Sequence, residues 1–372
     1  MSALGVVHVY KGCGPVHGGI EGHIDLLTRL LAERGLRPEI VCARPPGTAA
    51  YEDRGAVHIR RCTNLMTLAS APLPPGLPAA LWRSPADLVH LHFPWPPGEV
   101  AWLLGGRGRP LVVTVHCEVV RYPLLRRLVA PLTGAVLRAA ARIVVSGPFM
   151  RAAAFLAPHR DRLRVVPYGV DLERFHPDPG GSDPLPHVPH PRVIFVGRLR
   201  YYKGLPVLAA ALVRLPQAQL IVAGDGPQRR VFEDALHAAG CRARVHLLGD
   251  VAETHLVRLL QTADAAVLPS TSSAEAFGLA IAEAQACGVP AVTTEVGTAT
   301  AYTVADGVSG RVVAPNDSAA LAAALAWCLE PDAAGVRRAA ARRHAETALC
   351  ARRMAENIHS VYDEAYRHAH LP

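Results

Sequence analysis

Apolar runs of strand length alternate with longer amphipathic segments along the whole chain. The runs are apolar at consecutive positions, which is typical of parallel strands buried between layers of helices. The pattern therefore predicts an α/β fold with parallel sheets. In the first half, strands are expected at residues 6–10, 39–43, 57–61, 88–92, 111–115, 143–145 and 163–166, with a helix at about 24–34.

A change in composition separates this series from a second one. Residues 171–191 are dense in Pro, His and Asp, which is typical of a linker between domains. A chain of 372 residues is longer than one hydrophobic core usually supports, so two domains are expected. The second series predicts strands at residues 193–197, 220–224, 245–248, 265–268, 291–294 and 311–313, and then three consecutive helices from 318 to 368.

The charge balance narrows the class of ligand. The chain carries 39 basic and 31 acidic residues, a net charge of +8, which favours a phosphorylated ligand, an anionic membrane surface or nucleic acid. The basic residues are scattered, and aromatic residues make up only 5% of the chain. Nucleic acid is therefore not expected as a partner.

The cysteines and the lengths of the apolar segments indicate the cellular compartment in which the protein is expected. The eight cysteines show no C-x-x-C pair and no zinc-type spacing, so they are interpreted as reduced, buried thiols, and no metal site is predicted. No signal peptide and no run long enough to span a membrane is recognised, which indicates a cytoplasmic protein. Residues 122–142 are both apolar and basic, and they could contact an anionic membrane or form an ordinary docked helix.

Two glutamates frame a predicted helix in the second half. Glu275 lies in the loop before this helix, which is expected to start near Phe277, and Glu283 lies inside it. An acid beside the free N–H groups of a helix entrance can hold hydroxyls while the amides hold an anion, and a sugar nucleotide presents both. The alternative is a capped helix with an exposed acid, because acids are favoured in first turns.

Basic residues follow the first predicted strand of the second half. Arg198 comes directly after Gly197, and Lys203 is one of only two lysines in the chain, with Lys11. A strand, a glycine and basic residues leading into a helix form the arrangement that holds phosphate at the carboxyl edge of a parallel sheet. Two solvated surface cations are the alternative.

These segments resemble the signature of the family 4 glycosyltransferases, in which two glutamates separated by seven residues frame a Phe-Gly-Leu core. Phe277, Gly278 and Leu279 supply that core here. The resemblance implies the GT-B fold, with two Rossmann-like domains whose parallel sheets face a central cleft. It assigns residues 1–170 to acceptor binding and 171–350 to nucleotide-sugar binding, with 351–372 as a helix that crosses back to the first domain.

The resemblance also implies a role for each matching residue. Arg198 and Lys203 would neutralise the diphosphate, Glu275 would hold sugar hydroxyls, and Glu283 would hold the ribose. Strand-end His116 resembles a histidine that contacts the donor sugar or the reacting centre. The remaining donor-binding residues implied are Gly18 and Gly19 in the first domain, and Phe277, Gly278, Leu279 and Leu248 in the second.

The reaction implied is a retaining transfer of a hexosyl group from GDP-mannose or a UDP-hexose to a hydroxyl acceptor, without metal or cofactor. The acceptor is expected to be a lipid-linked glycan in surface polysaccharide assembly or, alternatively, a small natural product. A sugar-nucleotide 2-epimerase and a non-enzymatic sugar-nucleotide sensor are the other candidates. A dehydrogenase is disfavoured, because the glycine fingerprint after the first strand ends in His17 where it needs a third glycine.

Overall fold

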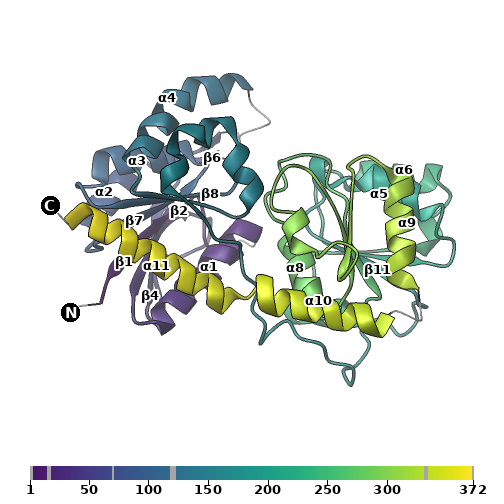
Figure 1. Cartoon of the computed structure of the whole chain (residues 1–372). Coiled ribbons are helices and arrows are strands. Elements are labelled where there is room, and N and C mark those ends of the chain that lie inside the picture. The colour runs from purple at the N-terminus through teal and green to yellow at the C-terminus, as the bar shows by residue number, and fades with distance from the viewer. Residues whose placement is uncertain (1–2, 15–17, 69–70, 118–122, 331–333, 371–372) are drawn as a thin grey trace. The chain divides into compact units, whose positions relative to one another are not determined.

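The computed structural model describes residues 3–14, 18–68, 71–117, 123–330 and 334–370 (Figure 1). The chain forms two compact units. Unit 1 comprises residues 1–167 and 351–372, and unit 2 comprises residues 168–350.

Unit 1 is built on a sheet whose described strands are parallel, except for one antiparallel pair at its edge. From edge to edge the strands are β10 (Leu163–Val165), β9 (Arg142–Val145), β8 (Leu111–Val115), β7 (Leu88–Phe93), β1 (Gly5–Val9), β2 (Arg37–Arg44), β4 (Val57–Thr63) and β3 (Tyr51–Arg54). A small hairpin, β5 (Thr67–Leu68) and β6 (Ala71–Pro72), lies outside this sheet.

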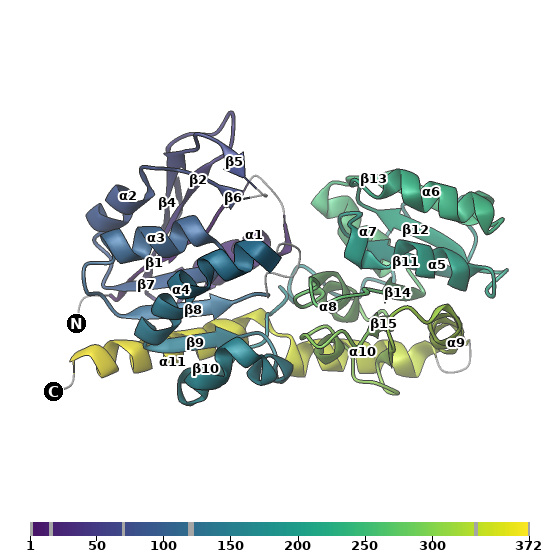
Figure 2. The same ribbon diagram turned by 90° about the horizontal axis from the view of Figure 1, so that it is seen from above.

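Helices cover both faces of the unit 1 sheet (Figure 2). They are α1 (Gly19–Glu33) and α11 (Ala351–His370) on one face, and α2 (Leu77–Arg83), α3 (Pro96–Gly105) and α4 (Pro123–Ala139) on the other. Successive strand residues point to opposite faces. Val6 and Val112 accordingly pack under α1 and α11, whereas Val7 and Val113 pack under the other group. The last helix of the chain, α11, therefore packs in the same hydrophobic core as the first strand, β1.

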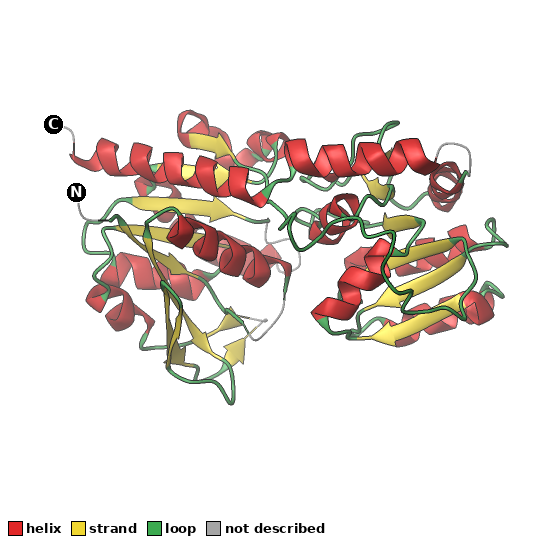
Figure 3. Ribbon diagram, turned by 90° about the horizontal axis from the view of Figure 1, so that it is seen from below, coloured by secondary structure: helices red, strands yellow, loops and turns green. Residues whose placement is uncertain are grey.

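Unit 2 contains a second parallel sheet with its own core. Its strands, in spatial order, are β13 (Val245–Gly249), β12 (Gln219–Ala223), β11 (Arg192–Val196), β14 (Ala265–Leu268), β15 (Ala291–Thr294) and β16 (Gly310–Val313). Its helices are α5 (Leu205–Leu212), α6 (Arg229–Ala238), α7 (Glu253–Gln261), α8 (Leu279–Ala286), α9 (Ser318–Leu329) and α10 (Ala334–Ala348) (Figure 3).

Short 3-10 helices complete the described secondary structure. They are η1 (Pro148–Ala152) and η2 (Ala154–Arg162) in unit 1, and η3 (Tyr201–Lys203), η4 (Arg242–Arg244) and η5 (Ala301–Thr303) in unit 2. The α/β class and the two parallel sheets expected from the sequence are confirmed.

Residues 171–191 differ from the expected linker. Phe175, Leu185 and Val188 are buried in the core of unit 2. The guanidinium of Arg192, itself buried, donates to both carboxylate oxygens of Asp183 at 2.8 Å. Composition indicated a polar tether because Pro, His and Asp dominate it, but a few apolar side chains are enough to anchor the segment.

In both sheets the strand order reverses direction at one position. In unit 2 the chain adds β12 and β13 on one side of β11, and then β14, β15 and β16 on the other. In unit 1 the corresponding position lies between β1 and β7. The loops beyond the carboxyl ends of two such strands leave in opposite directions, which makes this position the usual ligand-binding crevice of an open parallel sheet.

The apolar and basic segment near residue 130 is largely α4. A proline inside such a segment predicts a break or a kink at Pro131. There is no break, because one helix continues from Pro123 to Ala139. Among the described residues, no helix combines the length and apolar character needed to cross a membrane.

Gly204 offers a test of how closely the loops of unit 2 pack. Its φ is +67°, and a Cβ there would overlap the carbonyl oxygen of Pro269. Gly240 has nearly the same φ, +66°, but no atom lies within 4 Å of where its Cβ would be. We expect Gly240→Ala to lower the free energy of unfolding of unit 2 by about 1–2 kcal/mol through backbone strain alone, and Gly204→Ala to cost about 1–3 kcal/mol more through overlap.

Urea unfolding followed by hydrogen exchange in β11 and β14 would measure both variants. Equal losses of stability would show that the loop after β14 moves away from Gly204 without cost.

Candidate functional site

The loops after β11 and β14 meet at the point of reversal in unit 2. The first runs from Gly197 to Gly204 and the second from Pro269 to Gly278. The loop after β12 is pressed against the first one: a Cβ at Gly224 would overlap the carbonyl oxygen of Gly197, and one at Gly226 would lie 2.5 Å from that of Leu199. Glycines therefore let three loops converge at the carboxyl edge of the sheet.

Lys203 and Glu275, one from each main loop, form a buried ion pair. Lys203 Nζ lies 2.6 Å from Glu275 Oε2, and the two side chains are 11% and 10% exposed. Ser270 Oγ donates to the same carboxylate oxygen at 3.0 Å, and Thr298 Oγ1 donates to the Glu275 carbonyl at 2.7 Å. A buried carboxylate is tolerated when a cation and hydrogen-bond donors compensate it, and here both are present.

Arg198, in the same loop as Lys203, has a different environment. It is exposed, and no ion pair of the described residues includes it. The neighbouring acid Asp225 is paired with Arg229 at 3.1 Å. The positive charge of Lys203 is thus already balanced, whereas that of Arg198 is available to an anion.

The second glutamate of the motif lies inside α8. Burial raises the pKa of Glu283 to about 7, and the nearby charge of Arg174 opposes that rise. A carboxyl group with this pKa is partly protonated at neutral pH, so it can either donate or accept a hydrogen bond from a hydroxyl. Its position in the helix, with Glu275 in the loop before it, confirms the arrangement expected from the sequence.

The residues between the two glutamates shape the start of α8. Gly278 is the N-cap, with φ +84°, and a Cβ there would lie 2.9 Å from Leu268 Cδ2. Phe277 is only 2% exposed, and its ring centre lies 4.9 Å from that of Tyr168. The ring of Phe277 therefore belongs to the core of unit 2. Leu279, the first residue of the helix, is partly buried.

The other predicted donor-binding residues are more dispersed. Leu248 is partly buried on β13, beyond β12 from the crevice. Gly18 is the N-cap of α1 and Gly19 its first residue. Gly18 has φ −136°, an extended conformation open to any residue, although a Cβ there would meet the flexible side chain of Glu21. His17, also part of this loop, lies outside the described residues.

His116 comes directly after β8 in unit 1 and is 1% exposed. Its Nε2 lies 2.9 Å from Nδ1 of His92. From His92 the same buried hydrogen-bonded group continues to His8, Tyr362 and His90, three residues that the sequence did not single out. His90 and His92 are two positions apart on β7 and therefore lie on the same face of that strand. Nothing in the sequence pointed to the contact with Tyr362.

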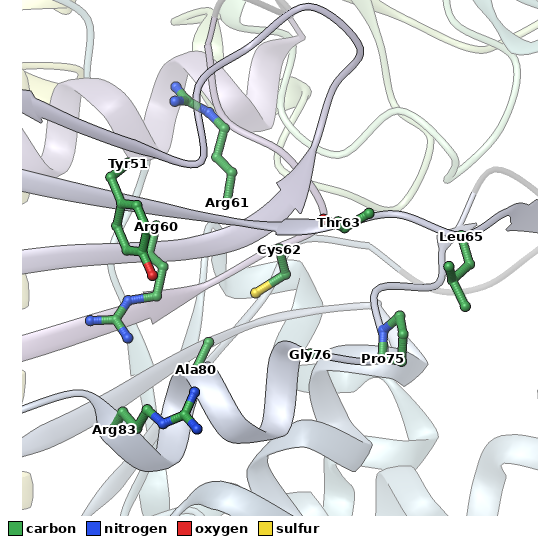
Figure 4. A pocket seen from close by; sticks show the side chains of 10 residues that line it. All are labelled: Tyr51, Arg60, Arg61, Cys62, Thr63, Leu65, Pro75, Gly76, Ala80 and Arg83. Atoms are coloured by element: carbon green, nitrogen blue, oxygen red, sulfur yellow. The ribbon is translucent and has the colours of Figure 1, made fainter.

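A cavity of about 250 Å³ opens near the end of β4 in unit 1, away from this histidine group (Figure 4). Arg60 lies beside the ring of Tyr51, with its guanidinium carbon 5.7 Å from the ring centre, and its Nε is 3.2 Å from Glu39. Arg61 points to the other side of the strand and donates to the Gly14 carbonyl at 2.9 Å. The guanidinium of Arg61 therefore supports the loop after β1.

Comparison with known proteins identifies similar sequences for both units. Residues 17–174 match the family described as Glycosyltransferase Family 4, and residues 185–346 match glycosyl transferases group 1. The O-antigen chain mannosyltransferase C of Escherichia coli is 31% identical over 335 residues, covering 86% of this chain and 87% of that protein. The D-rhamnosyltransferase WbpZ of Pseudomonas aeruginosa is 37% identical over 250 residues, covering 66% of this chain and 65% of that protein.

Solved structures share the fold. A sucrose-phosphate synthase from Thermosynechococcus elongatus superposes with a TM-score of 0.82 at 21% identity, over 98% of this chain and all of the other. Anabaena HepE, in complex with UDP and glucose, superposes with a TM-score of 0.78 at 20% identity, over 96% of this chain and 99% of the other. Both are similar in architecture across nearly the whole chain.

The buried ion pair predicts strong coupling between its members. Lys203→Met leaves the Glu275 carboxylate buried without its cation, and we expect a loss of about 3–5 kcal/mol in the free energy of unfolding of unit 2. Lys203→Met with Glu275→Gln should lose clearly less than the sum of the single variants, because no uncompensated charge remains.

The same double-mutant cycle on Arg229 and Glu233, a pair in the same unit whose side chains are 38% and 33% exposed, is the matched control. We expect coupling there of about 0.3–0.5 kcal/mol. Additive effects at Lys203 and Glu275 would show that water reaches the pair.

The buried histidines predict how the stability of unit 1 depends on pH. Burial lowers the pKa of His8 and His23 to about 3 and holds the pKa of His90, His92 and His116 well below its usual value. These groups bind protons in the unfolded chain below about pH 6.5 but stay neutral when folded, so their stabilisation is complete above that pH and is lost as the pH falls.

For each of these histidines, the free energy of unfolding of unit 1 should fall by about 1.4 kcal/mol for every pH unit by which the pH drops below 6.5. Glu99, whose pKa burial raises to about 7, acts in the opposite direction between pH 7 and 4.5, but it is a single group against five. Hydrogen exchange in β1, β7 and β8 from pH 7.5 to 5.5 would measure the effect. A stability of unit 1 that does not change over this range would contradict the burial of these rings.

Proposed function

The chain belongs to the family 4 glycosyltransferases and has the GT-B fold, and from this premise we propose that it is a retaining hexosyltransferase that uses a nucleoside diphosphate sugar. The observation that carries the proposal is the set of charges at the reversal point of unit 2: an available Arg198 beside a buried Lys203–Glu275 pair. A diphosphate bound there would be met by positive charge, and a sugar by oxygen acceptors held in fixed positions.

Each charged residue would take one part of the donor. Arg198 would grip phosphate oxygens through its planar guanidinium. Lys203 would be shared between Glu275 and a phosphate oxygen, and the free amides at the start of α8 would add to the positive field. Together these groups supply the charge that a divalent cation would otherwise provide, so we propose a reaction that needs no metal or other cofactor.

The environment of Glu275 supports a hydrogen-bonding role for its carboxylate. Its Oε2 is already engaged by Lys203 and Ser270, and a carboxylate held in that way is a poor nucleophile. We therefore propose a displacement on one face of the sugar. The bond from the anomeric carbon to the phosphate oxygen breaks, the bond to the acceptor oxygen forms on the same side, and the departing phosphate takes the acceptor proton.

The proposed donor and acceptor are based on the names of the relatives. Two relatives are named as a mannosyltransferase of O-antigen chains and a D-rhamnosyltransferase, which favours GDP-mannose or a related donor over a UDP-hexose. We propose a hydroxyl of a lipid-linked glycan as acceptor, with a small natural product as the second possibility. The reaction would take place in the cytoplasm, where α4, with Leu128 78% exposed, could contact an anionic membrane surface.

Binding of sugar nucleotides tests the proposed donor site directly. We expect GDP-mannose to stabilise the full chain against heat in the presence of EDTA, and Arg198→Ala to weaken this binding by about 10- to 100-fold through loss of a charge-assisted contact. The same variant should leave binding of the nucleoside guanosine unchanged. Arg214→Ala, an exposed arginine between the end of α5 and β12, is the matched control and should bind GDP-mannose normally.

UDP-glucose, UDP-GlcNAc and NADH complete the panel. Slow release of GDP without acceptor would support a transferase, and proton NMR of the glycoside product would show whether the anomeric configuration is retained. An epimerised sugar nucleotide formed without acceptor would replace the proposal by a 2-epimerase. Absence of binding by every sugar nucleotide, or equal binding by Arg198→Ala, would contradict the proposed site.

A further inference from the structure

The histidines of unit 1 share one face of the sheet because of strand register. His8 on β1 is the register partner of His90 on β7, and His92 is the partner of Thr114 on β8. His90 and His92 are two positions apart, as are Thr114 and His116, so each pair lies on a single face. This is the face that α11 covers, and it brings Tyr362 of that helix to the same group.

The side chains form one continuous line of hydrogen bonds. His116 Nε2 lies 2.9 Å from His92 Nδ1, and His92 Nε2 lies 3.1 Å from His8 Nδ1. His8 Nε2 lies 3.4 Å from the Tyr362 hydroxyl, which lies 2.6 Å from His90 Nδ1. The line ends with His90 Nε2, 2.7 Å from Thr114 Oγ1. The rings of His8, His90 and His92 thus use both of their nitrogens within it.

Ring orientation favours this line over a metal site. Nitrogens of His8, His90 and His92 lie within 4.8 Å of one another, close enough to suggest a shared ion. However, the rings of His90 and His92 are stacked, with centres 4.3 Å apart and planes at 26°, so their in-plane lone pairs run side by side and do not converge. His92 and His116 are instead nearly coplanar, at 11° with centres 5.1 Å apart, as an N–H···N bond between ring edges requires.

In a line of hydrogen-bonded neutral imidazoles, all the rings must donate in the same direction along the line. Each neutral ring carries one N–H donor and one acceptor nitrogen, so a ring that accepts on one side donates on the other. Reversing one ring would set two hydrogens or two lone pairs against each other in a buried place, which is costly. Burial lowers the pKa of these histidines and so keeps them neutral.

The lengths of the two hydrogen bonds of the Tyr362 hydroxyl indicate in which direction the line donates. A phenol is a stronger acid than a neutral imidazole, so an O–H donated to a ring nitrogen is expected to be shorter than an N–H donated to a phenol oxygen. The contact with His90 is 2.6 Å and the contact with His8 is 3.4 Å. Tyr362 therefore donates to His90 and accepts from His8. His8 then accepts from His92, and His92 accepts from His116.

We propose that Tyr362, acting through His8 and His92, fixes the tautomer of His116, with the proton on Nε2 and with Nδ1 as a hydrogen-bond acceptor. Tyr362, His8 and His92 are positioning residues in this scheme. Its importance for turnover rests on the proposed function, in which His116 meets the donor sugar or the reacting centre. The charged and titratable groups that act on His116 from neighbouring elements are Lys11 and His23.

NMR of the imidazole nitrogens in the full chain, labelled with ¹⁵N-histidine and without substrate, tests the tautomer directly. We expect His116 to carry its proton on Nε2 in the unmodified protein. Tyr362→Phe keeps the ring but removes the hydroxyl that orients the line, and it should give His116 a mixture of tautomers. Tyr366→Phe, on the same helix, and Thr114→Val, at the far end of the line, should both leave His116 unchanged.

A proton on Nδ1 of His116 in the unmodified protein, or an unaltered His116 in Tyr362→Phe, would overturn the proposal. If Tyr362→Phe does not fold, His92→Gln interrupts the same line from β7, and an unaltered His116 there would count equally against it. These readouts need no sugar nucleotide, so they stand even if the proposed function fails.

Turnover tests the second half of the proposal. We expect Tyr362→Phe to lower kcat about tenfold, the factor that corresponds to one buried hydrogen bond, with the KM for the donor changed by less than about a factor of two, since donor binding in unit 2 is untouched. Tyr366→Phe should have the kcat of the unmodified enzyme. An unchanged kcat in Tyr362→Phe, together with a mixed tautomer, would overturn the role in turnover.

Discussion

The reversal of strand order in a parallel sheet is the constraint on which the rest of this molecule depends. Where neighbouring strands send their following loops in opposite directions, backbone cannot fill the space beyond their carboxyl ends, and side chains must do so. In unit 2 that position lies between β11 and β14, and the side chains that occupy it are Lys203 and Glu275. In unit 1 it lies between β1 and β7, whose histidines join the buried line that reaches His116.

The two units bury polar groups at this edge in different ways. Unit 2 uses opposite full charges, which are compensated by each other and by the Ser270 hydroxyl. Unit 1 uses rings kept neutral by burial, which are compensated by a line of hydrogen bonds. A charge pair can exchange partners when an anion arrives, which suits the binding of a phosphate. A neutral line cannot do so without reordering every member, which suits the holding of one fixed geometry.

Much of the fold was predictable from the sequence, because buried parallel strands are long apolar runs, and those runs marked nearly every strand of both sheets. Polar β3 (Tyr51–Arg54) has no such signal and was missed.

The residues of the site were predictable only one segment at a time. Arg198 and Glu275 each lie in a loop that follows a predicted strand, and Glu283 lies in a predicted helix. The Lys203–Glu275 contact was not predictable from local pattern, because it requires β14 to lie beside β11 out of chain order. Phe277 was assigned to the donor site from its motif, whereas its ring belongs to the core.

The contact between α11 and the first strands has a consequence for how the protein is made. Val6 and Tyr362 belong to one unit, but all of unit 2 is synthesised between them. Domains generally fold in the order in which they are translated, and here unit 1 begins first yet lacks one of its covering helices until unit 2 has been translated. Throughout that interval, the part of the sheet face that α11 covers, with its apolar side chains and histidines, lacks this helix. We therefore expect the synthesis of unit 2 to be the period in which unit 1 depends most on protection from aggregation.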